Sequence, residues 1–365
     1  MKEKKRQYNN KLPKGCELCI TGEKSVLFIT GICPRHCFYC PISDQKYQKD
    51  VIYINEWKTD NFKNIITEIK LCKSKGVGIT GGDPLARIDR ACQFIKMLKK
   101  TFGKSFHIHL YTSLNLFTKT NLTKLYKSGL DEIRCHPDLD DNKLWSNMKT
   151  GTEFSWDFGM EIPIIPNKEK QTEQLINFAK EYVQFINLNE LEYSDTNAMK
   201  MQDYKTKNNE SYGIKGSEKL AKKLLKKYKK LNIHYCTASF KDNIQMRERI
   251  KKRAESIKKQ YEKLTEEGTI LRGTIYLKEL NPKLTYSEMQ NIIKNNDLMP
   301  KLQKAKNLIK DHFSIIKIDK NKLRILCPIN ELKKKKSIIK QLKLVPAIVE
   351  EYPTHDAMEV EIDFL

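Results

Sequence analysis

Long apolar segments are missing from this sequence of 365 residues. No stretch approaches the roughly 18 apolar residues that cross a bilayer as a helix. The first residues, MKEKKRQYNNKLPKG, are basic and lack the apolar core of a signal peptide. We therefore expect a protein without membrane spans that stays in the cytoplasm. Hydrophobic residues make up 39% and charged residues 31% of the chain, which indicates an ordered protein rather than a disordered or membrane protein.

Acidic residues are fewer than basic ones, and the formal net charge is +23. Clustered lysines neutralise phosphates, so this charge leaves RNA open as a partner. Lysine far outnumbers arginine, however, and a compositional bias would produce the same excess. The run of four lysines at 333–336 is typical of the solvated face of a surface helix. Charge alone therefore does not decide for a nucleic-acid partner.

Between about residues 24 and 245, short apolar runs alternate with longer helical stretches, which is typical of consecutive βα units. We expect six strands, at residues 25–30, 76–80, 106–111, 131–135, 158–165 and 183–191. The helices expected between or after them cover residues 57–74, 88–101, 119–128, 140–148, 170–182 and 217–231. Right-handed crossovers stack such strands into a parallel sheet, either open or curled into a full or partial barrel. Chemistry then gathers beyond the carboxyl ends of the strands.

The composition changes after residue 242. We expect a long basic helix at 243–267, stopped by Gly268, and then a small α+β module. Its expected strands cover 269–280, 314–328 and 344–363, and its expected helices cover 287–296, 302–311 and 329–342. The predicted organisation is an N-terminal extension at 1–23, an α/β core at 24–242 and a C-terminal part at 243–365.

Ten cysteines in a chain expected to be cytosolic point to metal or redox chemistry, because the cytosol keeps thiols reduced. Cys33, Cys37 and Cys40 form a C-x3-C-x2-C cluster just after the first expected strand. A 4Fe-4S cluster ordinarily takes four thiolates. Three thiolates from one loop would leave one iron without a protein ligand, and that iron could bind a small molecule directly.

A structural zinc site is the competing interpretation. Cys16 and Cys19 form one C-x2-C pair and Cys37 and Cys40 form another, which matches the spacing of zinc knuckles. Against it, the intervening run SVLFIT looks like a buried strand, and Cys33 would have no role. On this interpretation the protein would be a zinc-binding module that interacts with nucleic acid.

The second expected strand, GVGIT, runs directly into Gly81, Gly82, Asp83 and Pro84. Glycines at a strand end let the backbone approach a ligand closely, and proline fixes the chain on the way out. Alone, GGDP is a weak motif. Here it follows the cysteine loop by one βα unit, at the same end of the sheet.

Together, the loop CPRHCFYC, with an aromatic residue before its last cysteine, and the GGDP motif resemble the radical S-adenosylmethionine (radical SAM) superfamily. The resemblance is greatest to members related to glycyl-radical activating enzymes and covers about residues 24–240. It implies a partial (β/α)6 barrel. It also implies a 4Fe-4S cluster and S-adenosylmethionine as cofactors, and a flavodoxin- or ferredoxin-like one-electron reductant as partner.

The resemblance further implies roles for individual residues. Cys33, Cys37 and Cys40 would ligate the cluster, Tyr39 would lie near the adenine, and the four GGDP residues would face the methionyl group. Asp83 stands where the family more often has Glu, a mild departure because backbone atoms make much of this contact. The implied reaction is a one-electron cleavage that releases methionine and a 5′-deoxyadenosyl radical, which takes a hydrogen atom from the substrate.

Polar residues on strands buried on both faces are candidates for the substrate site, since buried polar groups need partners. They are His107, His109, Tyr111, Thr112, Ser113, Glu132, Arg134, His136, Glu161, Asn187, Asn189, Glu190 and Glu192. Each could equally be a structural polar residue. The catalytic candidates are those nearest the carboxyl ends of the strands: Thr112, Ser113, His136, Glu190 and Glu192.

The remaining cysteines and the substrate stay open. The pair Cys16 and Cys19 could be reduced thiols, or could bind a second metal or cluster together with Cys135, Cys236 or Cys327. The substrate could be an RNA or a protein docked by the C-terminal part, or a small molecule.

Overall fold

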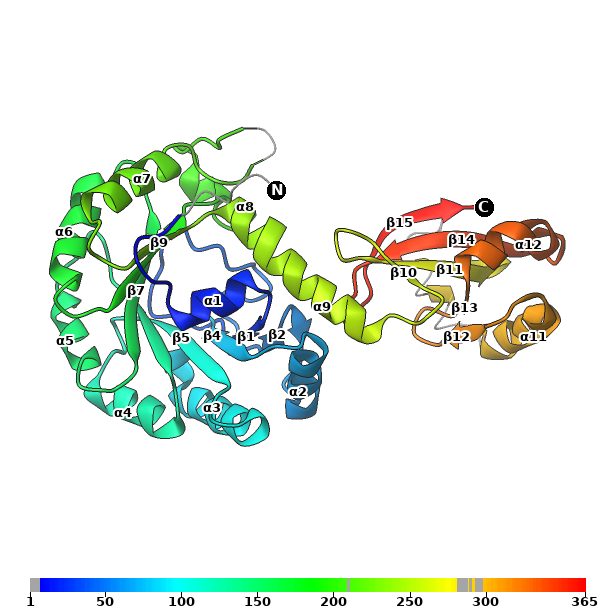
Figure 1. Ribbon diagram of the computed structural model, residues 1–365, viewed down its shortest axis with the longest axis horizontal. Coiled ribbons are helices and arrows are strands. Elements are labelled where there is room, and N and C mark those ends of the chain that lie inside the picture. Colours follow the sequence, from blue (N-terminus) through cyan, green and yellow to red (C-terminus); the bar gives the residue numbers. More distant parts are fainter. Residues whose placement is uncertain (1–6, 209–210, 281–287, 289–290, 293–297) are drawn as a thin grey trace. The chain divides into compact units, whose positions relative to one another are not determined.

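The computed structural model describes residues 7–208, 211–280, 288, 291–292 and 298–365. The chain divides into two compact units, Met1–Arg249 and Ile250–Leu365. In the first unit, a curved parallel sheet carries helices on its outer side (Figure 1). The second unit contains a smaller, separate sheet.

In its described residues, the first unit has a nine-stranded sheet in the order β3-β2-β1-β4-β5-β6-β7-β8-β9. Its parallel strands are β1 (Lys24–Phe28), β4 (Gly76–Thr80), β5 (His107–Ser113), β6 (Glu132–His136), β7 (Asp157–Ile164), β8 (Phe185–Glu190) and β9 (Ile233–Cys236). An antiparallel hairpin, β2 (Tyr53–Ile54) and β3 (Trp57–Lys58), extends the sheet beyond β1. The predicted α/β class with a parallel sheet is confirmed, and β9 is a seventh parallel strand beyond the six expected.

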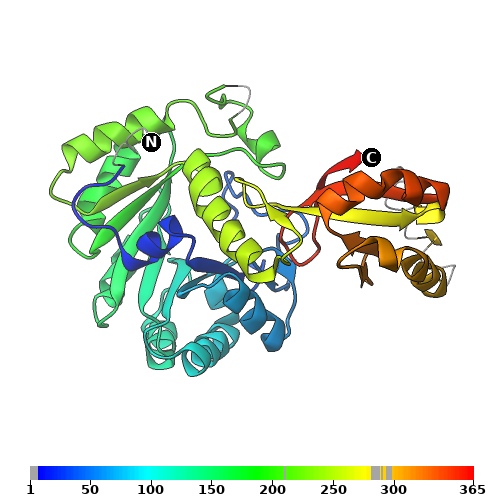
Figure 2. The same ribbon diagram turned by 45° about the vertical axis from the view of Figure 1, so that its right-hand side comes forward.

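Helices alternate with the parallel strands and lie on the outer side of the sheet, as two views show (Figures 1 and 2). They are α2 (Phe62–Leu71), α3 (Ile88–Phe102), α4 (Lys119–Ser128), α5 (Met148–Gly151), α6 (Glu169–Ala179) and α7 (Ser217–Lys227). Helix α3 illustrates why they pack there, because its buried residues include Ala91, Phe94, Ile95 and Leu98, which share one face. That face joins the main hydrophobic core between sheet and helices.

Two helices are shorter than the sequence suggested. Residues 57–58 belong to the hairpin rather than to a helix at 57–74, and α2 begins after Asn61, whose side chain accepts a hydrogen bond from the Lys63 amide. The helix expected at 140–148 is a 3-10 turn, Trp145–Asn147, followed by α5. Before it, the Asp141 side chain accepts the Lys143 amide and so favours a turn over a helix.

The N-terminal residues lie inside the curve of the sheet and along its last strand. Helix α1 (Lys14–Ile20) lies on the inner side, opposite the outer helices (Figure 1), and the Gly15 amide donates to Glu132 at the amino end of β6. Residues 7–9 pair with β9, through the Tyr235 amide to the Gln7 carbonyl at 2.7 Å and the Asn9 amide to the Ile233 carbonyl at 2.8 Å. This pairing covers the outer edge of β9, which would otherwise stay open.

After β9 the chain forms α8 (Ala238–Phe240), a π-helical stretch at Lys241–Met246 and α9 (Arg247–Ile257), which crosses the boundary between the units. The basic helix expected at 243–267 therefore ends ten residues early. Beyond it, β10 (Lys263–Leu264) pairs with the next strand around Gly268, whose φ of +96° is readily adopted only by glycine.

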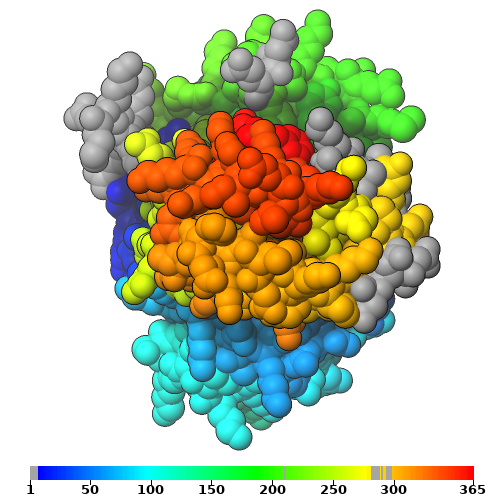
Figure 3. Space-filling view, turned by 90° about the vertical axis from the view of Figure 1, so that its right-hand side faces the viewer, coloured from blue at the N-terminus to red at the C-terminus, as the bar shows by residue number. Residues whose placement is uncertain are grey.

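The second unit has a sheet ordered β12-β13-β11-β14-β15, with β10 paired to β11, in the described residues. These strands are β11 (Ile270–Leu277), β12 (Lys317–Asp319), β13 (Arg324–Cys327), β14 (Leu344–Glu351) and β15 (Glu359–Phe364). The strands expected at 314–328 and 344–363 are thus two antiparallel pairs. Helices α11 (Met299–Ile309) and α12 (Ile329–Gln341) share a core with this sheet, and their outer side chains form a contiguous surface (Figure 3). The helix expected at 287–296 lies mostly outside the described residues.

Candidate active site at the carboxyl ends of the strands

Cys33, Cys37 and Cys40 are free thiols in the long loop between β1 and β2. All three are partly exposed. Burial raises the pKa of Cys33 to about 11, and the charges of Asp83 and of the other two cysteines act in the same direction. Cys33 is therefore close enough to the other two cysteines to interact with them, and its thiol stays protonated until a cation compensates the charge of the thiolate. This donor set fits an iron–sulfur cluster, whose irons bind thiolates.

The root of the cysteine loop is joined to the GGDP motif by backbone hydrogen bonds. The Gly82 amide donates to the Thr30 carbonyl at 2.7 Å, and the Asp83 amide donates to the Ile32 carbonyl at 2.8 Å. A Cβ atom at Gly82 would lie 2.5 Å from the carbonyl oxygens of both Gly31 and Ile32. Glycine is therefore needed at position 82 for this close approach, and the two motifs are packed directly against each other.

The side chain of Asp83 connects the GGDP motif to the end of β5. Its carboxylate accepts hydrogen bonds from the Leu85 amide (3.0 Å), the Thr112 hydroxyl (2.8 Å), the Ser113 amide (3.0 Å) and the Ser113 hydroxyl (2.6 Å). The side chain is fully buried, and burial raises the pKa of the carboxyl group although these donors oppose the rise. Both carboxylate oxygens are thus occupied within the protein.

Two residues between the cysteines bind the end of β6. The Tyr39 hydroxyl lies 2.9 Å from Nε2 of His136, and the Arg35 guanidinium donates to the His136 carbonyl and to the Asp138 carboxylate, both at 2.8 Å. Nδ1 of His136 lies 2.7 Å from the Glu161 carbonyl, so both ring nitrogens are engaged. Burial lowers the pKa of His136 to about 4, and Arg35 contributes to the lowering. His136 is therefore neutral at pH 7.

The loop after β8 also contacts the cysteine loop. The Asn197 side chain donates to the Tyr39 carbonyl at 3.1 Å, and the Tyr204 ring stacks on Phe38 with centroids 6.1 Å apart. Sequence reasoning missed Arg35, Asn197 and Tyr204. Only Arg35 carried a signal, because it lies between two cysteines of the motif.

The five catalytic candidates fall into two groups. Thr112, Ser113 and His136 contact Asp83 or Tyr39 and so adjoin the two motifs. At the end of β8, Glu190 accepts the Ala238 amide at 2.9 Å and forms an ion pair with Lys207, while Glu192 lies 3.3 Å from the Lys241 ammonium.

The other C-x2-C pair lies elsewhere. The Cys16 thiol, on α1, contacts the Arg134 guanidinium at 3.5 Å and the Asn187 amide at 3.4 Å, and burial raises its pKa. Cys135 points to the opposite side of the sheet, into the hydrophobic core, and Cys327 belongs to the core of the second unit. Cys135 therefore lies on the other face of the sheet from Cys16 and does not share a cluster with it.

A single zinc ion at 2.3 Å from four thiolates would hold them about 3.8 Å apart. Among the residues that the structure describes, no three thiols lie within 4.8 Å of one another. The two C-x2-C pairs thus do not form the zinc site considered above. The three thiols of the loop between β1 and β2 instead offer one ligand to each of three irons of a cluster.

Comparison with known proteins decides the family. A model of the radical SAM superfamily matches residues 27–158. A protein of Methanocaldococcus jannaschii, provisionally named a glycyl-radical enzyme activating enzyme, is 39% identical over 364 residues, covering 96% of this chain and 92% of that protein. The chain belongs to the radical SAM superfamily. The resemblance inferred from the cysteine loop and GGDP is thereby confirmed, and so is the prediction of an enzyme.

Other proteins match with lower identity. The PqqA peptide cyclase of Bradyrhizobium diazoefficiens is 29% identical over 113 residues, or 30% of this chain and 26% of that protein. Among solved structures, methylornithine synthase (PylB) matches 57% of this chain and 63% of its own, with 12% identity and a TM-score of 0.42. Coproporphyrinogen III oxidase (HemN) of Escherichia coli matches 92% and 94%, with 8% identity and a TM-score of 0.39.

Membership of the radical SAM superfamily implies a 4Fe-4S cluster and S-adenosylmethionine as cofactors, and a source of electrons as partner. In the described part of this radical SAM protein, no helix has the length and apolar character needed to cross a membrane.

Proposed function

We propose that this protein cleaves S-adenosylmethionine reductively at a 4Fe-4S cluster held by Cys33, Cys37 and Cys40. The observation that carries the proposal is the placement of three free thiols on one loop whose root is hydrogen-bonded to the GGDP motif. The cluster that these three cysteines would hold would supply the one electron needed to split the sulfonium bond to C5′, which would give methionine and a 5′-deoxyadenosyl radical able to take a hydrogen atom from the substrate.

The contacts of Asp83 suggest how the GGDP motif acts. Its carboxylate already accepts four hydrogen bonds inside the protein. We therefore assign the contact with the methionyl group to the backbone of Gly81, Gly82, Asp83 and Pro84 rather than to the carboxylate. The side chain holds the motif in place, and this explains why the shorter Asp serves where the family more often has Glu.

Thr112, Ser113 and His136 are proposed as positioning residues. Thr112 and Ser113 fix Asp83, and His136 fixes Tyr39, which we place near the adenine. Glu190 and Glu192 are the candidates for contact with the substrate, because Glu190 is the last residue of β8 and Glu192 lies two residues beyond it, at the carboxyl end of this strand.

For the substrate, we propose a polypeptide. The support is the provisional name of the M. jannaschii relative, which denotes an enzyme that acts on another enzyme. RNA and small molecules are the alternatives. In this proposal a C-terminal part at 243–365 docks the macromolecule, and a flavodoxin- or ferredoxin-like protein delivers the electron.

The cluster assignment is tested with anaerobically reconstituted protein, dithionite and S-adenosylmethionine. We expect the wild type to form 5′-deoxyadenosine and Cys37→Ala to form none, because two thiolates cannot hold the cluster. Cys92→Ala is the matched control, since this buried cysteine lies on the outer helix α3 and should leave cleavage unchanged. Normal cleavage by Cys37→Ala would refute the assignment.

The substrate class is tested by adding protein extract, tRNA or a metabolite pool to the same reaction. The polypeptide proposal predicts that 5′-deoxyadenosine rises with the protein extract and that protease treatment of the extract removes the rise. A rise with tRNA or metabolites alone would reject it and leave the cluster assignment intact.

A further inference from the structure

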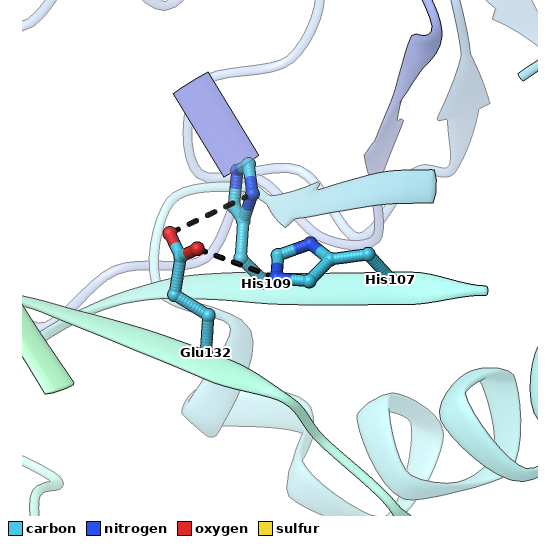
Figure 4. A group of neighbouring side chains, drawn as sticks. All are labelled: His107, His109 and Glu132. Carbon is cyan, nitrogen blue, oxygen red and sulfur yellow. Dashed lines mark ion pairs between the residues drawn. The ribbon is translucent and has the colours of Figure 1, made fainter. Parts of the chain in front are cut away.

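A second group of metal-binding side chains lies at the amino ends of the strands, away from the cysteine loop. His107 and His109 on β5 and Glu132 on β6 point toward one another (Figure 4). Nε2 of His107 lies 3.4 Å from one carboxylate oxygen of Glu132, and Nδ1 of His109 lies 4.0 Å from the other. The three ligand atoms lie within 4.8 Å of one another. Two imidazoles and a carboxylate are a ligand set typical of zinc and ferrous iron.

The group is buried, and two of its nitrogens lack a hydrogen bond. His107 is 8% exposed, His109 1% and Glu132 0%. Neither Nε2 of His107 nor Nδ1 of His109 has a hydrogen-bond partner in the described structure, and 3.4 and 4.0 Å are longer than a good N–H···O bond. Buried nitrogens without partners are costly. Both face the same carboxylate, so one bound ion would satisfy them together.

Neighbouring residues fix the orientation of the ligands. Nδ1 of His107 faces Nζ of Lys24 at 2.6 Å, so the opposite ring nitrogen is directed toward Glu132. With an ion bound at Nε2, the ring proton would reside on Nδ1 and the neutral amine of Lys24 would accept it. The Gly15 amide of α1 donates to Glu132 at 3.0 Å. A Cβ atom at Gly15 would lie 2.5 Å from Nδ1 of His109 and 2.9 Å from Glu132, so only glycine leaves these ligand atoms clear. Outer hydrogen bonds of this kind are typical of metal ligands.

The surrounding charges restrict the kind of ion. Arg134 forms ion pairs with Glu132 and with Glu161, whose carboxylate is 2.8 Å away. The negative charge of Glu132 is therefore already balanced by a guanidinium. A hard ion such as Mg²⁺ or Ca²⁺, which depends on several anionic oxygen ligands, is disfavoured. An ion bound chiefly through imidazole nitrogen fits better.

The separation between ligand atoms agrees with such an ion. Nitrogen and oxygen ligands at 2.0–2.2 Å from tetrahedral zinc lie about 3.4 Å apart. The distance from Nε2 of His107 to its nearer Glu132 oxygen already has this value. The 4.0 Å from Nδ1 of His109 runs to the other oxygen, and one ligand atom from each of the three residues lies within 4.8 Å of the other two.

We propose that His107, His109 and Glu132 bind one first-row divalent transition ion, with zinc as the probe, at the amino end of the barrel. The site is separate from the cysteine loop, because Glu132 begins β6 whereas Tyr39 and Arg35 bind its last residue, four residues or about 13 Å along the strand. Helix α1 covers the site, so the ion has a structural role and holds this helix against the strands.

The test uses full-length Cys33→Ala/Cys37→Ala/Cys40→Ala protein, so that the cysteine loop cannot take up zinc. Equilibrium dialysis against micromolar zinc should give one equivalent bound. Glu132→Gln or His109→Asn, added to this background, should weaken binding at least tenfold, since even outer partners of a metal ligand contribute 10- to 100-fold. His234→Asn is the matched control, because His234 is also a buried histidine of the barrel strands but lies outside the group.

Binding of less than half an equivalent by the triple variant, or equal affinity in Glu132→Gln and His234→Asn, would overturn the proposal. X-ray absorption by zinc in the triple variant provides a second measurement that needs no further substitution. We expect nitrogen and oxygen ligands at about 2.0–2.2 Å with imidazole scattering. A sulfur shell at about 2.3 Å would instead assign the zinc to Cys16 or Cys19.

Discussion

Replacing Asp83 with Asn tests whether this side chain holds the GGDP motif. The carboxylate accepts hydrogen bonds at both oxygens, from Leu85 and Thr112 at one and from Ser113 at the other. Asparagine keeps one oxygen and replaces the other with an NH2 group. If the NH2 group takes the place of the first oxygen, the buried Leu85 amide loses its acceptor. If it takes the place of the second oxygen, the buried Ser113 amide loses its acceptor. The two hydroxyls can rotate and accept instead.

The expected cost follows from this count. A buried donor left without an acceptor costs about 1–3 kcal/mol. Removing a charge that burial already disfavours returns part of this cost, as the raised pKa of Asp83 indicates. We therefore expect Asp83→Asn to lower the free energy of unfolding by about 2 kcal/mol.

Tryptophan fluorescence during urea denaturation measures this change selectively. All three tryptophans, Trp57, Trp145 and Trp156, belong to the first unit, so the signal does not report on the second. The exposed Asp44→Asn is the control and should leave the midpoint unchanged. If Asp83→Asn unfolds at the same urea concentration as the wild type, the carboxylate does not hold the motif.

Three further predictions use the same protein. Gly82→Ala places a Cβ against two carbonyl oxygens and should lower the free energy of unfolding of the first unit by about 1–3 kcal/mol in the fluorescence assay. The variant should also fail to hold the cluster on reconstitution, and a normal iron content would contradict this. Tyr39→Phe removes only the hydroxyl group that is hydrogen-bonded to His136. Because one hydrogen bond contributes roughly 1 kcal/mol, 5′-deoxyadenosine formation should become about fivefold slower. An unchanged rate would show that this hydrogen bond does not position Tyr39. Burial alone would raise the pKa of Glu132, but Arg134 and His107 lower it from 4.5 to about 2. The ionised carboxylate therefore stabilises the fold above pH 4.5, and this stabilisation is lost as the pH falls toward 2. Glu132→Gln should make the free energy of unfolding less dependent on pH between 4.5 and 2. An equally steep dependence in the variant would contradict the ion pair with Arg134.

The sequence was most informative where local pattern sets the structure. The cysteine loop and GGDP each follow a short apolar strand, and a parallel sheet brings the ends of neighbouring strands together. The parallel α/β fold and the adjacency of these two motifs could therefore be predicted. Trp57 could not be placed correctly, because its apolar side chain suits a helix as well as the β2–β3 hairpin.

Contacts between distant segments could not be predicted. Thr112 and Ser113 were selected for their position at a strand end, but their bonds to Asp83 depend on how β5 packs beside β4. Glu132 lies opposite His109 only because of the register between β5 and β6, which no local pattern in the sequence specifies. The histidines were therefore recognised as inward-facing residues without their carboxylate partner.

The proposal that three cysteines hold the cluster and leave one iron open is tested most directly by electron paramagnetic resonance of the reduced, reconstituted wild-type protein. If one iron is open to S-adenosylmethionine, adding it must change the g values of the reduced 4Fe-4S cluster, and Cys37→Ala must lack the signal. A signal that stays the same when S-adenosylmethionine is added, or protein that holds zinc instead of iron at these cysteines, would contradict the account.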